Sequence, residues 1–172
     1  MLPVLILAKL REQVDRADHL LSLVPAGSLE WKPDAPTTSG RPPAVVGRVI
    51  GHLLECLAGS CAALYAANSD RLGHFLLLRQ RPVNHSAQPE EARERIREYM
   101  RHIEEGFALL SNADLERVVP TVFVPSGEAL ITLLLGNLEH LINHKYQLFF
   151  YLKLLGVPVG SRDLYCWRGE AQ

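Results

Sequence analysis

A single apolar segment near the C-terminus constrains the fold more than any other part of the sequence. Residues 129–155 read ALITLLLGNLEHLINHKYQLFFYLKLL, and apolar side chains occur on almost every face of the helix that this stretch predicts. We expect this helix to run from Ser126, a suitable N-cap, to Leu155, and to end before Gly156. A helix that is apolar nearly all round must be covered on several sides. Other helices of the chain must therefore surround it, and a second subunit can cover the remainder.

Three further segments show apolar residues at steps of three and four, which is the spacing of an amphipathic helix. We expect these helices at Pro3–Val24, Pro43–Ala67 and Pro89–Leu110. In the last of them, proline at the first position and two glutamates after it suit a helix start. The inward residues of Pro43–Ala67 are small, so that a neighbouring helix or a ligand can come close. Together the four helices predict an all-α, up-down four-helix bundle in one domain, residues 1–172.

The connections between the later helices are long. Between the second and third helices, residues 68–88 contain at most a short helix around Phe75–Leu78. A connection of this length is often a lid or part of a binding site. Between the third and fourth helices, Val118–Val124 has β-forming residues, but Pro120 and Pro125 limit it to an extended loop or a short edge strand.

Composition and charge exclude several classes of partner. The chain is 48% hydrophobic and 22% charged, its formal net charge is -1, and its acidic and basic residues are intermixed. We therefore expect no nucleic-acid partner. No run approaches the roughly 18 uninterrupted apolar residues of a membrane span, and the helix after Ser126 comes closest. The opening MLPVLILAKLREQ lacks a basic leader and a cleavage site, so we expect neither a signal peptide nor a membrane partner.

Cysteine usage indicates a reducing, cytoplasmic setting. Cys56, Cys61 and Cys166 are odd in number and follow neither a CxxC nor a disulfide-framework spacing. We expect Cys56 and Cys61 to be small, buried apolar residues. Of the two tryptophans, Trp31 is expected to plug the end of the bundle and Trp167 to pack back on it from the tail.

Three histidines form the candidate site. His140 and His144 stand four apart, so they share one helix face with their Cβ atoms roughly 6 Å apart. His52 takes an inward position on the second helix, and the three imidazoles converge if the second and fourth helices pack side by side. A lone inward histidine is more often a core residue with one satisfied hydrogen bond. Three buried imidazoles without a metal would instead leave several ring nitrogens without partners, which costs free energy.

The spacing also excludes two kinds of metal chemistry and favours another. Leu141 stands where a zinc protease of the HExxH type needs its glutamate base, and the inward glutamates of a di-iron bundle are missing. Three neutral nitrogen ligands would leave a divalent ion its full charge and an open coordination position. Such a site lowers the pKa of a bound water, to about 7 in zinc enzymes, or binds a thiol as thiolate. Imidazole suits zinc, nickel, copper and iron, and we expect zinc or nickel.

Two further residues are weaker candidates for a catalytic role. Glu55 lies one turn after His52 and can accept a proton or orient a ligand, although a solvated helix glutamate is the more common case. Gln147 lies one turn beyond His144 and either supports that ligand or bonds a neighbouring helix. The remaining polar candidates are assigned to solvated loops and surface: His19, His74, Arg79, Arg81, His85 and His102.

The order of three motifs resembles the DinB-like (DinB/YfiT) superfamily of metal-binding four-helix bundles. The motifs are LEWKP after the first helix, IGHLLECLAGS around His52, and NLEHLINHKYQLFFYLKLLGV around His140 and His144. The resemblance covers nearly the whole chain and implies that these three histidines are metal ligands. The family often has Arg-Gly-Gln after the last histidine, whereas Lys145, Tyr146 and Gln147 follow it here. Characterised members include transferases and isomerases that use low-molecular-weight thiols, and hydrolase activity has been proposed for others.

Two functions from different classes follow. The first is a homodimeric, metal-dependent enzyme, a hydrolase or a thiol S-transferase, in which the ion on His52, His140 and His144 activates water or a low-molecular-weight thiol toward a small-molecule substrate. The second is a binding or structural module in which the trio is packed core or a static metal staple. The second function is motivated by the sequence, in which no residue can be assigned clearly as a general base.

Overall fold

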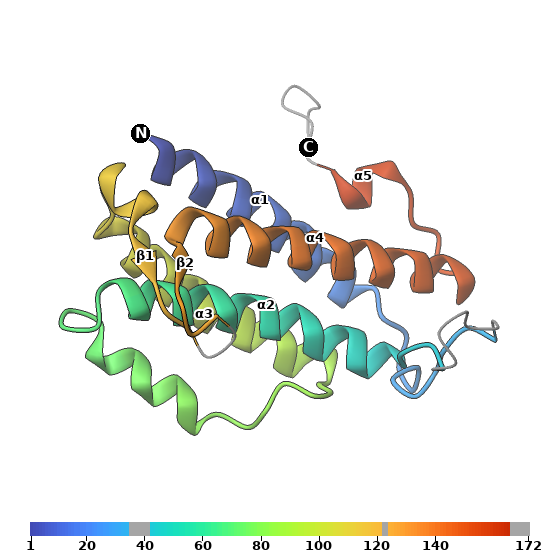
Figure 1. Cartoon of the computed structure of the whole chain (residues 1–172). Helices are drawn as coiled ribbons and strands as arrows, with labels where there is room; N and C mark the ends of the chain where they lie inside the picture. Colours follow the sequence, from blue (N-terminus) through green and yellow to red (C-terminus); the bar gives the residue numbers. More distant parts are fainter. Residues whose placement is uncertain (35–41, 122–123, 166–172) are drawn as a thin grey trace.

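Four long helices form the fold (Figure 1). The computed structural model describes residues 1–34, 42–121 and 124–165. The long helices are α1 (Leu2–Ser22), α2 (Val46–Ala67), α3 (Pro89–Ala108) and α4 (Leu130–Leu154). The shorter elements are η1 (Gly73–Gln80), η2 (Ala113–Glu116), β1 (Val118–Val119), β2 (Glu128–Ala129) and α5 (Ser161–Leu164). The predicted, mostly helical architecture is confirmed, and the expected short helix in the second connection is η1.

The order of the helices around the bundle differs from a simple up-down succession. α2 packs mainly against α4 and α3, and α1 packs against the other sides of α3 and α4, so α1 and α2 lie diagonally. α2 and α3 run in the same direction, because Cys61 contacts Tyr99 and Leu64 lies against Gly106. The reason is the connection 68–88, which runs back along α2 through η1 and lets α3 begin beside the start of α2 (Figure 1). Long connections of this kind permit non-alternating bundles.

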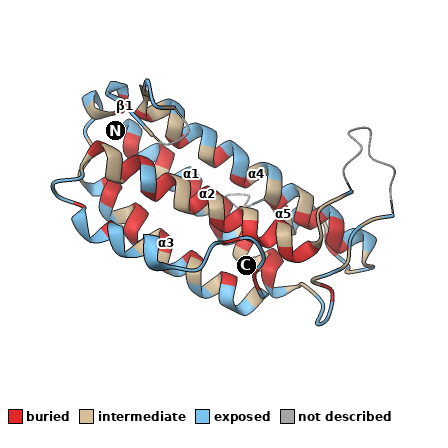
Figure 2. Cartoon of the chain, turned by 60° about the horizontal axis from the view of Figure 1, so that its bottom comes forward, coloured by how far each residue is buried: buried red, intermediate tan, exposed pale blue. Residues whose placement is uncertain are grey.

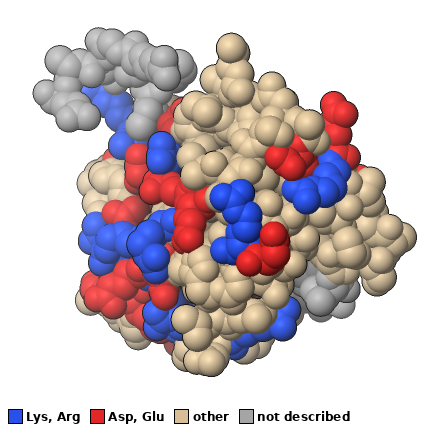
Figure 3. Space-filling view, turned by 90° about the vertical axis from the view of Figure 1, so that its left-hand side faces the viewer, with Lys and Arg blue, Asp and Glu red and all other residues tan. Residues whose placement is uncertain are grey.

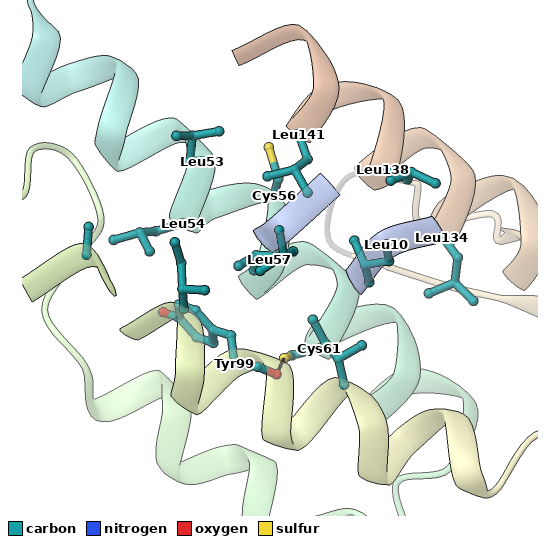
Figure 4. Packing of buried hydrophobic residues seen from close by; sticks show 14 of the residues in the cluster. Leu10, Leu53, Leu54, Cys56, Leu57, Cys61, Tyr99, Leu134, Leu138 and Leu141 are labelled. Carbon is teal, nitrogen blue, oxygen red and sulfur yellow. Dashed lines mark hydrogen bonds between the residues drawn. The ribbon is translucent and has the colours of Figure 1, made fainter. Parts of the chain in front are cut away.

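The core lies where the four apolar faces meet, and α2 contributes most to it. Leu53, Leu54 and Leu57 of α2 are at most 1% exposed. Figure 4 shows them beside leucines of α1 and α4 and beside Tyr99 of α3. The apolar spacing of the third helix predicts an inward stripe of Ala92, Ile96, Tyr99, Ile103, Phe107 and Leu110. The first five are buried and Leu110 is half-buried. Figure 2 shows the opposite face of α3 exposed. Each apolar face follows from residues three and four apart.

Cysteine burial agrees with the sequence, and so does the place of Trp31. Cys56 and Cys61 are free and buried among these leucines (Figure 4). The Trp31 ring meets Tyr151 of α4 edge to face, with the ring centroids 5.5 Å apart. Cys166 and Trp167 lie outside the described residues.

Of the described residues, only the helix α2 is long and apolar enough to cross a membrane by length and composition. Its most apolar window has a mean hydropathy of 1.5. The sequence instead pointed to α4, which is interrupted by histidine, asparagine and lysine. Because 61% of the α2 window is buried inside the bundle, the apolar character of α2 fits a core helix.

The start of α4 also differs from expectation. The N-cap is Ala129 and not Ser126, because the chain turns at 125–127 and then pairs β2 with β1 before the helix begins. Val118 pairs with Ala129 and Val119 with Glu128, in an antiparallel ladder. The short edge strand expected after Arg117 is therefore present as β1, and its partner delays the helix by one turn.

Lys145 fixes the rotation of α4 about its own axis. This lysine is only 2% exposed, although lysine side chains are usually solvated. Its Nζ donates to Oε1 of Gln13 on α1 at 2.6 Å and to the carbonyl of Leu164 on α5 at 3.0 Å. Neighbouring residues on a helix point about 100° apart. Holding Lys145 toward α1 and α5 therefore turns His144 toward α2.

Substitution of Gly51 should destabilise the fold because the second connection crosses α2 at this residue. A Cβ at Gly51 would overlap the backbone oxygen of Asn84 and lie 2.8 Å from the carbonyl carbon of His85. We expect Gly51→Ala to lower the free energy of unfolding by about 1–3 kcal/mol, measured by urea unfolding. The control is Gly136→Ala in α4, where a Cβ meets open space and should add about 0.5–1 kcal/mol. Equal effects of the two variants would contradict the close crossing.

Candidate metal centre

The three predicted histidines converge between α2 and α4. One ring nitrogen from each of His52, His140 and His144 lies within 4.8 Å of the other two. The Nε2 atoms of His140 and His144 are 2.8 Å apart. The rings of His52 and His144 stack almost parallel, with their centroids 4.7 Å apart. The antiparallel α2–α4 contact thus brings together residues that are far apart in sequence.

The trio lies at the surface and not in the core that the sequence suggested. His140 is exposed, and His52 and His144 are half-buried. The buried positions of α4 are different ones: Leu130, Leu134, Leu138, Leu141, Lys145, Leu148, Phe149, Tyr151 and Leu152. The helix is covered by α2 and α1, and the histidine face lies at the edge of the α2 contact, where it opens to solvent.

The geometry and chemistry of the trio fit a divalent metal ion. Nitrogen ligands of tetrahedral zinc lie roughly 3.3 Å apart, given Zn–N distances of about 2.0–2.1 Å. The observed separations, from 2.8 Å to at most 4.8 Å, bracket this spacing. Nδ1 of His52 is buried and has no hydrogen-bond partner in the described part of the chain. A ring in this position is suited to bind an ion through Nε2, with Nδ1 facing the carboxylate of Glu55.

A chain of hydrogen bonds sets the tautomer of His144. The Tyr151 hydroxyl donates to the carbonyl of Ala44 at 3.0 Å, so its oxygen accepts from Nε2 of Gln147 at 3.2 Å. Oε1 of Gln147 then faces Nδ1 of His144 at 3.0 Å. Because an amide oxygen only accepts, Nδ1 carries the proton and Nε2 keeps its lone pair. Of the two roles considered from sequence, Gln147 therefore shows the first, support of a histidine of the trio, whereas its other hydrogen bond goes to Tyr151 of the same helix and not to a neighbouring helix.

Glu55 lies against the other half of the site. Its Oε2 is 2.6 Å from Nδ1 of His52, a close contact that lacks hydrogen-bond geometry. Its Oε1 is 3.9 Å from Nδ1 of His85, and Arg48 donates to that same nitrogen at 3.0 Å. The Glu55 side chain is 32% exposed. It is therefore a partly screened carboxylate within reach of the trio and not a fully solvated one.

Electrostatics keep the ring of His144 neutral and the nearest thiol protonated. Burial lowers the pKa of His144, helped by the charges that His140 and His52 can carry, although the Gln147 hydrogen bond acts in the opposite direction. Burial, and then the charge of Glu55, raises the pKa of Cys56 to about 12. The Cys56 thiol also donates to the carbonyl of His52 at 3.0 Å. Cys56 is therefore neither a thiolate ligand nor a nucleophile at neutral pH.

An open groove begins one helical turn from His140. It has a volume of about 760 Å³ and lies between the C-terminal half of α2 and the first half of α4, with Asn137 and Gly59 at its near end. A Cβ at Gly59 would overlap Oδ1 of Asn137, so the small residue permits the close helix approach that the sequence predicted. Most of the groove wall is apolar, and Arg79 of η1 reaches it.

Several of the remaining candidates have partners, and the sequence predicted the wrong place for one of them. Arg81 pairs with Glu98 at 2.5 Å, and His19 contacts Asp163 at 2.7 Å. His102 was expected at the surface, but it is only 6% exposed. The reason is η1, which covers this part of α3 and places the Phe75 ring 4.9 Å from the His102 ring.

Comparison with solved structures places this fold among DinB-like proteins. The chain superposes on a DinB-like protein (YjoA) from Bacillus subtilis with a TM-score of 0.63, covering 88% of this chain and 92% of that one. The two sequences are 16% identical, so the similarity describes the fold. No protein-family model and no curated protein sequence matches the chain. The DinB-like fold expected from the three motifs is therefore confirmed by structure.

Replacement of Gln147 tests the tautomer of His144. In Gln147→Leu, Nδ1 loses its acceptor, so the share of the Nε2–H tautomer should rise in the metal-free protein, and zinc affinity should fall by about 10–100-fold. Nitrogen-15 NMR of the imidazoles and zinc titration measure these effects. Asn143→Leu, on the exposed face of the same helix, is the matched control and should change neither. An unchanged tautomer in Gln147→Leu would contradict the hydrogen-bond assignment.

Proposed function

We propose that this protein is a metal-dependent enzyme, a hydrolase or a thiol S-transferase, with a divalent ion on His52, His140 and His144. Zinc and nickel are the favoured ions. The proposal is supported by the convergence of three imidazoles at a solvent-exposed position. A groove for a small-molecule substrate begins beside them. A buried staple would need none of this access.

The metal ion would supply the charge that lowers the pKa of a water or a thiol at neutral pH. No carboxylate belongs to the trio, so its ligands would leave that charge undiminished. Gln147 accepts the proton of Nδ1 in a hydrogen bond, which leaves the lone pair on Nε2 of His144 free to bind the ion. Glu55, whose Oε2 lies 2.6 Å from Nδ1 of His52, is the carboxylate that we propose receives the proton of the nucleophile.

The walls of the groove and the charges on the surface indicate which class of substrate the protein can bind. A thiol nucleophile must come from solution, because Cys56 is buried and protonated. The mostly apolar groove suits an organic molecule of low molecular weight. Figure 3 shows acidic and basic side chains interspersed on one end of the bundle, which does not favour a polyanion there. We propose a cytoplasmic enzyme that uses neither nucleic acid nor membrane as partner.

A static metal staple is the alternative function. It shares the trio but requires an ion whose coordination positions are all filled by the protein. Among the described residues no fully buried base lies beside the trio, and the Glu55 side chain is 32% exposed; this observation favours the staple. In that case the ion would act on stability alone.

Metal content and turnover test the enzyme directly. We expect zinc- or nickel-loaded protein to turn over activated esters or electrophiles with a low-molecular-weight thiol, and His144→Ala to lose the ion of this site and at least about 100-fold in rate. His19→Ala is the control, because it removes a histidine of similar exposure outside the trio. Equal metal content in His144→Ala and the unaltered protein would rule out the site.

Chelation separates the enzyme from the staple. An enzyme with an accessible ion should lose turnover in chelator while its thermal midpoint falls modestly. A staple should show no turnover and a large fall, since binding energy there is folding energy.

We also propose a homodimer formed through the outer face of α4. Tyr146, Phe150 and Leu154 lie four residues apart on this face and are each 50–53% exposed. Residues four apart on a helix make one continuous stripe. A second copy of the chain can cover such a stripe by a two-fold contact in which each helix meets its equivalent. Because α4 is apolar nearly all round, the sequence already predicts that a second subunit can cover part of this helix.

A charge in this stripe should separate the subunits. Phe150→Glu is expected to convert the dimer to a monomer in light scattering coupled to size-exclusion chromatography, because a buried unpaired carboxylate is costly. Leu77→Glu, on η1 and 63% exposed, is the control and should leave the dimer intact. A monomeric unaltered protein at micromolar concentration would refute the dimer.

A further inference from the structure

We propose that this protein has a second binding site for a divalent transition-metal ion, formed by His74 of η1 together with His102 and Glu105 of α3. One ligand atom from each of the three lies within 4.8 Å of the others. The site shares no residue with the trio on α2 and α4, and it does not depend on the function proposed for that trio.

Local structure brings the three side chains together. His102 and Glu105 stand three apart on α3, so they share one face of that helix. His74 comes from η1, where the neighbouring Phe75 is buried at 4% exposure and fixes the segment on α3. Nε2 of His74 is 2.9 Å from Oε2 of Glu105, and Nδ1 of His102 is 3.9 Å from the same oxygen. The His74 and His102 ring centroids are 5.8 Å apart.

An unpartnered buried nitrogen points to a ligand at this position. Nδ1 of His102 is buried and has no hydrogen-bond partner in the described part of the chain. The whole residue is only 6% exposed. A buried polar atom without a partner costs roughly 1–3 kcal/mol. An ion at the centre of the cluster would accept the lone pair of this nitrogen and remove that cost.

The donor set and the surrounding charges are suitable for such an ion. Two imidazoles and a carboxylate are a known ligand set of zinc. The cluster borders an open cavity of about 510 Å³, which gives the ion access from solvent. Of the charged groups around it, Arg81 is neutralised by Glu98. Arg101 donates to Nε2 of His102 at 3.0 Å. When an ion binds Nδ1, the ring proton moves from Nδ1 to Nε2, and the exposed side chain of Arg101 can then turn to solvent.

The ion would add a metal bond between η1 and α3 to the side-chain contacts that already join these two elements. η1 forms part of the wall of the groove, through Arg79. A metal bond from His74 to α3 would hold η1 in place and with it this wall. The effect expected is slower amide hydrogen exchange in residues 73–80 when zinc is present.

Zinc stoichiometry of the full chain tests the proposal. After removal of excess zinc on a desalting column, the unaltered protein should retain two ions, and His74→Ala one. His144→Ala should also retain one ion, and the double variant none. His19→Ala is the matched control: its ring is 39% exposed and bonded to one carboxylate, as the His74 ring is 41% exposed and bonded to Glu105. It should retain two ions.

Each outcome decides between the sites. If His74→Ala and His19→Ala retain equal zinc, the second site does not exist. If His144→Ala retains as much zinc as the unaltered protein while His74→Ala loses one ion, zinc binding at the trio is refuted and the second site is supported. Glu105→Gln repeats the test without touching a ring, and circular dichroism verifies that each variant is folded. Zinc must slow amide hydrogen exchange in residues 73–80 of the unaltered protein but not in His74→Ala. The same effect of zinc on exchange in both proteins would overturn the proposal.

Discussion

The antiparallel contact between α2 and α4 is the interaction on which the rest of the structure depends. Gly59 lets the two helices approach until Asn137 fills the space of a missing side chain. Lys145 supplies the second condition, because its buried hydrogen bonds to Gln13 and Leu164 fix which face of α4 meets α2. Distance and rotation together place His52 opposite His144. Neither condition involves a histidine, so the arrangement of the trio follows from packing and does not require an ion to assemble it.

Sequence periodicity predicted what is local and missed what depends on distant partners. The helices, the inward stripe of α3 and the histidine pair four apart were all readable, since each depends on residues within two turns. The parallel course of α2 and α3 was not, because it depends on the path of residues 68–88. The burial of Lys145 and His102 was equally hidden. Lys145 needs acceptors from both ends of the chain, and His102 is covered by η1.

The exposure of the trio changes what its polar atoms require. In a sealed core, three imidazoles would have to satisfy all their nitrogens within the protein. At the edge of the α2–α4 contact, only the inward nitrogens need protein partners. For His144 the partner is Gln147, whose orientation is set through Tyr151 by the carbonyl of Ala44. The sequence could place Gln147 one turn from His144, but the direction of the hydrogen bonds depends on residues outside α4.

The two histidine clusters differ in a property that predicts different chemistry. Three neutral nitrogens leave a divalent ion its full charge, which is what lowers the pKa of a bound nucleophile. In the second cluster Glu105 would offset half of that charge, and the ion would contact two separate elements, η1 and α3. A reduced charge and a bridging position favour holding structure over activating a nucleophile. The catalytic role that we propose is therefore assigned to the trio on α2 and α4, and the cluster on η1 and α3 is suited to stabilise the wall of the groove where the substrate would bind.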